Sequence, residues 1–155
     1  METLIPSLRV WNTWKQVRKL TVVAVYEDVA TGTRVEDFCR GLVRDLGNRC
    51  DLSRQMWLVS ELRLTKLRAI AATEAAAADM IVIAVHHAEA LPDEVRSWLT
   101  LWHATRRTRP AVLVALFDPL FSGSSSGIQT YLKETAKAAR ADFVAYSDES
   151  AEART

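Results

Sequence analysis

Short apolar runs alternate along this chain with longer segments in which apolar residues recur every three or four positions. The runs predict strands at residues 20–26, 80–85, 111–117 and 142–146, and a weaker run at 50–58, interrupted by charges, predicts an edge strand. The runs at 80–85 and 111–117 are wholly apolar, and the run at 20–26 nearly so. Such runs are typical of strands that are buried on both faces.

The segments between these strands have the period of amphipathic helices. In the first, a stripe from Val35 to Leu46 predicts a helix that begins at an N-cap Thr33, with Glu36 completing a capping box, and ends at Gly47. We expect the turn from Glu27 to Thr33 to be a polar loop.

The other three helices are predicted at residues 62–78, 91–102 and 128–139. The first of these is rich in alanine, and one face is expected to hold Leu64, Leu67, Ile70, Ala71 and Ala78. In the second, Trp98 and Trp102 fall on one apolar stripe, with Leu101 outside it.

Strands and helices therefore alternate from end to end, which predicts parallel strands joined by right-handed crossovers. We therefore expect a three-layer α/β/α fold, with a five-stranded parallel sheet in the order 2-1-3-4-5. We expect residues 20–147 to form a single domain, residues 1–19 to be a lead segment that packs on the domain or on a partner, and residues 148–155 to be a polar tail.

Composition restricts the classes of function. The chain has 155 residues, of which 49% are apolar and 25% charged, with a net charge of +1. This balance argues against disorder, and it offers no field that would attract nucleic acid or an anionic membrane. The apolar runs are too short to cross a bilayer, and the start of the chain has no signal peptide pattern. We therefore expect a cytoplasmic protein, in which Cys39 and Cys50 form neither a disulfide nor a metal site.

In the order of its strands and helices the chain resembles the flavodoxin-like group, which includes the receiver domains of response regulators. It also resembles a group of short bacterial proteins of unassigned function. That likeness rests on the strand end Val25-Tyr26-Glu27-Asp28, on the helix from Leu91-Pro92 to Trp98, and on the strand end Ala115-Leu116-Phe117-Asp118. The resemblance implies the fold and brings no activity with it.

Receiver and flavodoxin signatures match only in part. Glu27 and Asp28 fit the acidic pair of receivers, but His86 or His87 stands at the phosphoacceptor position. Asp118 replaces the receiver hydroxyl, and Ser147-Asp148 replaces the lysine, so the resemblance does not imply phosphotransfer. Flavodoxins bind the phosphate of FMN in the first loop. There this chain has Thr31-Gly32-Thr33, in a shorter motif preceded by two carboxylates.

Ligands of open parallel sheets bind beyond the carboxyl ends of the strands, at the point where strand order reverses. The candidate ligand-binding residues at that edge are Glu27, Asp28, His86, His87 and Asp118. One hypothesis is a functional pocket in which carboxylates and a histidine bind a small ligand or metal, or act as acid and base. The alternative is that these polar residues are simply solvated strand ends.

A serine-rich loop gives a second candidate. Ser124, Ser125, Ser126 and Gly127 precede the last helix, where backbone N–H groups would bind an anion. The alternative is a flexible loop whose last serine caps the helix. The string Gly123-Ser124-Ser125-Ser126-Gly127 also matches a serine-nucleophile motif, but no histidine follows it, which excludes the hydrolase order.

Three hypotheses for function remain. The favoured one is a non-catalytic module that binds a small ligand or a protein, with no cofactor and no metal. The others are an enzyme or metal-binding protein that uses the acidic edge, and a flavin or nucleotide binder. We also predict a homodimer, formed through Trp11 and Trp14 in the lead segment, because exposed apolar segments of this kind usually mark contact surfaces.

Overall fold

A computed structural model describes residues 19–46, 51–86, 91–105, 111–117 and 126–147. The elements in chain order are β1 (Lys19–Tyr26), α2 (Val29–Asp45), β2 (Asp51–Leu58), the 3-10 helix η1 (Val59–Arg63), α3 (Thr65–Ala76), β3 (Met80–Val85), α4 (Asp93–His103), β4 (Val112–Phe117), α5 (Ser126–Ala138) and β5 (Asp142–Ser147). The lead segment with Trp11 and Trp14, the predicted helix-ending Gly47, and the tail lie outside the described residues.

The five strands form one parallel sheet in the order β2-β1-β3-β4-β5, which confirms the predicted fold class. The inner strands β3 and β4 are buried along their whole length, as their apolar runs predict. The charged strand β2 is at one edge, and β5 is at the other.

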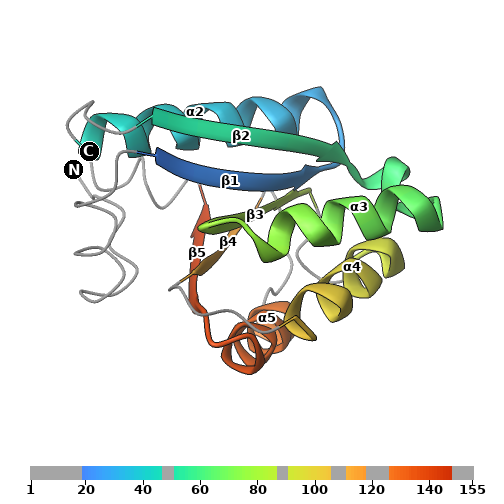
Figure 1. Ribbon diagram of the computed structural model, residues 1–155. Helices are drawn as coiled ribbons and strands as arrows, with labels where there is room; N and C mark the ends of the chain where they lie inside the picture. The colour runs from blue at the N-terminus through green and yellow to red at the C-terminus, as the bar shows by residue number, and fades with distance from the viewer. Residues whose placement is uncertain (1–18, 47–50, 87–90, 106–110, 118–125, 148–155) are drawn as a thin grey trace.

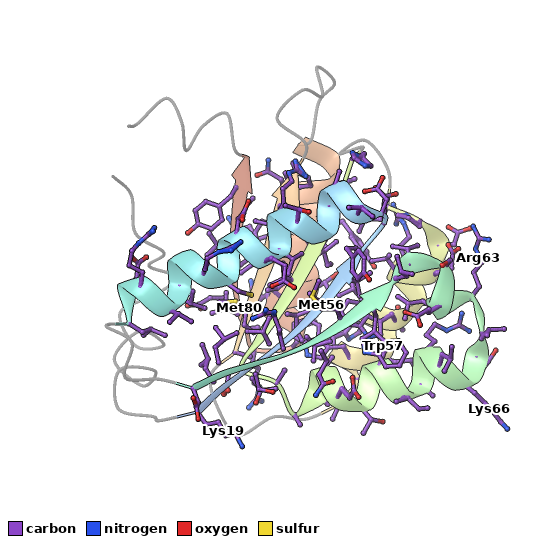
Figure 2. The ribbon with its side chains drawn as sticks, turned by 90° about the horizontal axis from the view of Figure 1, so that it is seen from above. Lys19, Met56, Trp57, Arg63, Lys66 and Met80 are labelled. Carbon is purple, nitrogen blue, oxygen red and sulfur yellow. The ribbon has the colours of Figure 1, made fainter. Side chains whose placement is uncertain are left out.

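Helices cover both faces of the sheet (Figure 1). Helix α2 lies across one face (Figure 2), over alternate strand residues such as Val22, Val82 and Val114. The opposite face, which includes Val23 and Ile83, packs against α3, α4 and α5. Each strand therefore contributes to two cores, because successive side chains of a strand point to opposite faces.

The helix predicted at 62–78 is wrong in its first turn, and its predicted buried face is confirmed at Ala71 and Ala78 but wrong at Leu64 and Ile70. Residues 59–63 form η1, and α3 begins only at Thr65. Leu64 is 61% exposed and Ile70 49% exposed, whereas the predicted Ala71 is buried together with Ala72 and Ala75. A stripe of methyl groups lets the helix axis lie close to its neighbours, and this close packing decides which face turns inward.

Two tryptophans fill the space between α4 and the sheet. Trp98 and Trp102 are fully buried, and Leu101 is 43% exposed, so the predicted stripe of α4 is confirmed. Neither indole Nε1 has a hydrogen-bond partner within the described structure. On the surface, the Arg96 guanidinium lies 4.8 Å from the centre of the Tyr131 ring and links α4 to α5.

Cys39 is buried on the sheet-facing side of α2, and this burial raises the pKa of its thiol to about 11. At pH 8 roughly one thiol in a thousand is then ionised, and the thiolate is the reactive form. In a Cys50→Ser variant we therefore expect the native protein to react with a disulfide reagent at least about 100-fold more slowly than the same protein in urea. Comparable rates in the two states would contradict the burial of this thiol.

Candidate functional site

The turn between β1 and α2 has only two residues, Glu27 and Asp28. Helix α2 begins at Val29, with Asp28 as its N-cap and Thr31 completing the capping box. The predicted N-cap at Thr33 is therefore wrong, and so is the predicted loop. Thr33 lies inside the first turns of the helix, where its hydroxyl donates to the Val29 carbonyl at 2.9 Å. Asp28 and Thr31 have the spacing of a capping pair, and this earlier pair starts the helix.

Thr31 holds this turn together. Its hydroxyl oxygen accepts hydrogen bonds from the backbone N–H groups of Glu27, at 2.8 Å, and Asp28, at 2.9 Å. In return, Asp28 Oδ1 accepts a hydrogen bond from the Thr31 N–H at 3.0 Å. The Thr31 side chain is fully buried, so its hydroxyl replaces water for these donors.

The next residue, Gly32, allows a close approach between α2 and the end of β1. A Cβ atom at Gly32 would lie 3.0 Å from a ring carbon of Tyr26, closer than side chains normally pack. The motif Thr31-Gly32-Thr33 is thus part of the helix and does not form a phosphate-binding loop.

His86 follows β3, which is the neighbour of β1 in the sheet. Its backbone N–H donates to Glu27 Oε1 at 2.6 Å, and its ring Nε2 lies 2.6 Å from Asp28 Oδ2. Three of the predicted site residues therefore lie together where the strand order reverses. The side chains of His86 and Asp28 are partly exposed. His87 and Asp118 lie outside the described residues.

The cluster favours the ionised form of Asp28. The Thr31 backbone N–H, followed by the His86 ring, donates to this carboxylate and holds the pKa of Asp28 below its ordinary value of 3.8. A carboxyl group whose pKa is lowered in the folded state stabilises the fold above its unfolded pKa, and this contribution is lost as the pH falls through the folded pKa. We therefore expect part of the acid destabilisation below about pH 4 to come from Asp28.

Urea unfolding of wild type and of an Asp28→Asn variant between pH 2 and pH 7 measures this contribution. The variant should lose less stability between neutral and acidic pH, because asparagine has no proton to gain. The pKa of Glu94 is also lowered, because the Arg63 side chain donates a hydrogen bond to its carboxylate. A Glu94→Gln variant therefore provides the comparison. Equal pH dependence of wild type and Asp28→Asn would contradict the assignment.

One cation near this edge was not found from the sequence. Arg34 of α2 donates from Nη2 to the carbonyl oxygen of Phe117, the last residue of β4, at 2.6 Å. Arg34 reaches the end of β4 because α2 crosses the sheet. In the sequence it is only an arginine beside the apolar stripe, so this contact could not be predicted. The edge therefore combines two carboxylates, a histidine and a guanidinium.

The serine-rich candidate is only partly described. Gly127 lies in the first turn of α5, and a Cβ atom there would meet open space. Ser124, Ser125 and the side chain of Ser126 lie outside the described part. Within the described residues, no three His, Cys, Asp or Glu side chains form a group that could hold a metal ion. Nor does this part of the chain contain a helix long and apolar enough to cross a membrane.

Two grooves lined by described residues lie away from this edge. The larger, about 750 Å³, runs between α5 and β5, and the smaller, about 240 Å³, lies over α2 beside Cys39 and Arg54. Neither groove was predicted from the sequence.

Comparison with protein-family models and with curated proteins finds no match. Among solved structures, the fold is similar to that of a short-chain flavodoxin associated with a non-canonical PDU bacterial microcompartment. The TM-score is 0.51 at 15% sequence identity, over 83% of this chain and 84% of that one. This similarity agrees with the flavodoxin-like sheet order, and at this level of identity it concerns the fold alone.

Proposed function

We propose that this chain is a non-catalytic binding module whose ligand lies at the carboxyl ends of β1 and β3. The observation that carries the proposal is the mutual hydrogen bonding of the polar residues there. Asp28 is bonded to Thr31 and His86, and Glu27 is bonded to the His86 N–H. A general base or a nucleophile has to reach a reacting atom, whereas these groups bond to one another and hold the edge in shape.

The chemistry of the edge favours a ligand that donates hydrogen bonds. A carboxylate offers about four lone-pair directions, and the bonds to protein donors leave some of them for a ligand. The Asp28 side chain is 49% exposed, so its remaining acceptor capacity faces solvent. An amine or an amide is therefore the ligand group that best matches this edge.

Flavin binding is the second candidate, favoured by the fold similarity to a short-chain flavodoxin. A flavin phosphate would need the free N–H groups at the start of α2. In this chain the Asp28 carboxylate already caps that helix, and it would repel a phosphate. The local chemistry thus supports the binding module over the flavin protein.

Calorimetric titration at pH 7 with spermidine, FMN and inorganic phosphate tests the proposal. We expect spermidine to bind, and we expect FMN and phosphate not to bind. Asp28→Asn keeps an oxygen for the Thr31 N–H and removes the charge, so it should weaken spermidine binding about fivefold. Asp93→Asn makes the same charge change on an exposed position of α4 and should leave the affinity unchanged. Stoichiometric FMN binding, with quenched flavin fluorescence, would overturn the proposal.

A further inference from the structure

The groove between α5 and β5 has the features of a docking site for an extended peptide. Its floor contains the partly buried apolar side chains of Phe143 and Ala145 from β5. Its wall is α5, which contributes Lys133 and Lys137, both exposed. Figure 1 shows α5 beside β5 at one edge of the sheet.

Strand β5 offers backbone groups on its outer side. Within the described structure it pairs only with β4. The Asp142 N–H donates to the Ala111 carbonyl at 3.0 Å, toward β4. Because amide directions alternate along a strand, the N–H groups of Phe143 and Ala145 point away from β4, toward the side of β5 on which no described strand lies. Unpaired N–H and C=O groups of this kind form a template for another strand.

The charged side chains that line the groove are the two lysines and Asp142, so positive charge is in excess and favours an acidic partner. The two lysines are four residues apart on α5, so they share a face of the helix and repel each other slightly. Neither lysine makes an ion pair with another described residue. A carboxylate between or beside them would remove this repulsion and complement both charges.

The spacing of the lysines also fits an extended chain. Four residues advance about 6 Å along a helix, and two residues advance about 7 Å along a strand. Carboxylates at alternate positions of a strand would therefore meet Lys133 and Lys137 in register. The residues between them would point to the other side of the added strand.

We propose that the β5 edge and the α5 groove bind an extended peptide segment with acidic residues at alternate positions, by addition of a strand to β5. The backbone of β5 supplies the main-chain hydrogen bonds, and the lysines select the carboxylates. This site is separate from the carboxyl edge of β1 and β3 and does not depend on the function proposed there.

Fluorescence anisotropy with a labelled peptide Val-Glu-Val-Glu-Val, on the full chain, tests the proposal. We expect saturable binding, and weaker binding of Val-Glu-Glu-Val-Val, in which adjacent glutamates point to opposite sides of the strand. A double variant, Lys133→Glu with Lys137→Glu, should weaken binding of the first peptide about tenfold. It should also acquire affinity for Val-Lys-Val-Lys-Val.

A matched control reverses two lysines elsewhere. Lys19→Glu with Lys66→Glu changes the net charge equally, at β1 and α3, where Figure 2 shows both side chains. This control should bind the acidic peptide like wild type. Equal affinities of the two double variants would overturn the proposed lysine contacts.

Ala145→Pro tests the strand addition. It removes one outward N–H and leaves the pairing with β4 intact, and proline is tolerated on edge strands at such positions. Binding should weaken about tenfold while the thermal unfolding midpoint changes little. Undiminished binding by this variant would overturn the strand addition. A dimer that dissociates on this substitution would assign the edge to a second copy of the chain and would likewise overturn the peptide proposal.

Discussion

Replacing Thr31 by valine is expected to lower the free energy of unfolding by about 2–4 kcal/mol. Valine keeps the shape of the side chain but cannot accept the hydrogen bonds from the Glu27 and Asp28 N–H groups. Both donors belong to the tight turn before α2 and are partly buried, and a donor left unsatisfied there costs up to about 1–3 kcal/mol. Urea unfolding followed by circular dichroism measures the loss.

Two further threonine variants are the controls. Thr31→Ser keeps the hydroxyl and loses one methyl group, so we expect the free energy of unfolding to fall by about 1 kcal/mol. Thr33→Val removes a hydroxyl that donates to the Val29 carbonyl within the helix and is exposed to solvent, and it should change stability by less than about 0.5 kcal/mol. A Thr31→Val variant as stable as Thr33→Val would show that the turn does not depend on this hydroxyl.

Trp98→Ala is expected to destabilise the fold by about 3–5 kcal/mol, because it opens a cavity under α4. Trp98 has no solvent exposure and packs within the larger of the two hydrophobic cores. Trp98→Phe should cost much less, about 1–2 kcal/mol. The smaller ring still fills much of the space, and it also removes an indole N–H that has no hydrogen-bond partner among the described residues.

Thermal and urea unfolding of the two Trp98 variants distinguish the cost of losing side-chain volume from the cost of losing the indole N–H. Leu101→Ala on the exposed side of α4 is the surface control and should cost less than about 1 kcal/mol. If Trp98→Phe were as damaging as Trp98→Ala, the indole N–H would have a partner of real importance, and our account of this core would be wrong.

The fold could be predicted from the sequence because the apolar runs and the alternation of strands with helices both indicate a parallel sheet covered by helices. The inner strands β3 and β4 are apolar at every position, and the charged strand β2 could only be accommodated at an edge. The start of the first helix could not be predicted in the same way. Thr33 and Asp28 both have the local signals of an N-cap, and the structure starts the helix at Asp28, whose side chain accepts a hydrogen bond from the Thr31 N–H. The close approach of Gly32 to Tyr26 is compatible with that start and is visible only in three dimensions.

The candidate site was predictable to the same extent. A general rule for open parallel sheets places ligands at the point where strand order reverses, and this rule led to Glu27, Asp28 and His86. It did not lead to Arg34, because the long side chain reaches the end of β4 from α2. The direction in which α2 crosses the sheet cannot be read from the residue pattern. The groove between α5 and β5 was missed for a related reason. Its lysines and its apolar floor become neighbours only when the helix packs against the edge strand.

The position of β1 in the sheet has a consequence for synthesis on the ribosome. This strand is the first of the sheet to be translated, yet it lies between β2 and β3. Its second neighbour is complete only at Val85, 59 residues after Tyr26 (85 minus 26). At ribosomal rates this delay lasts roughly 3–12 seconds. During that time the apolar nascent segment has no partner on one side, so it is the part of the emerging chain that a chaperone has most reason to protect.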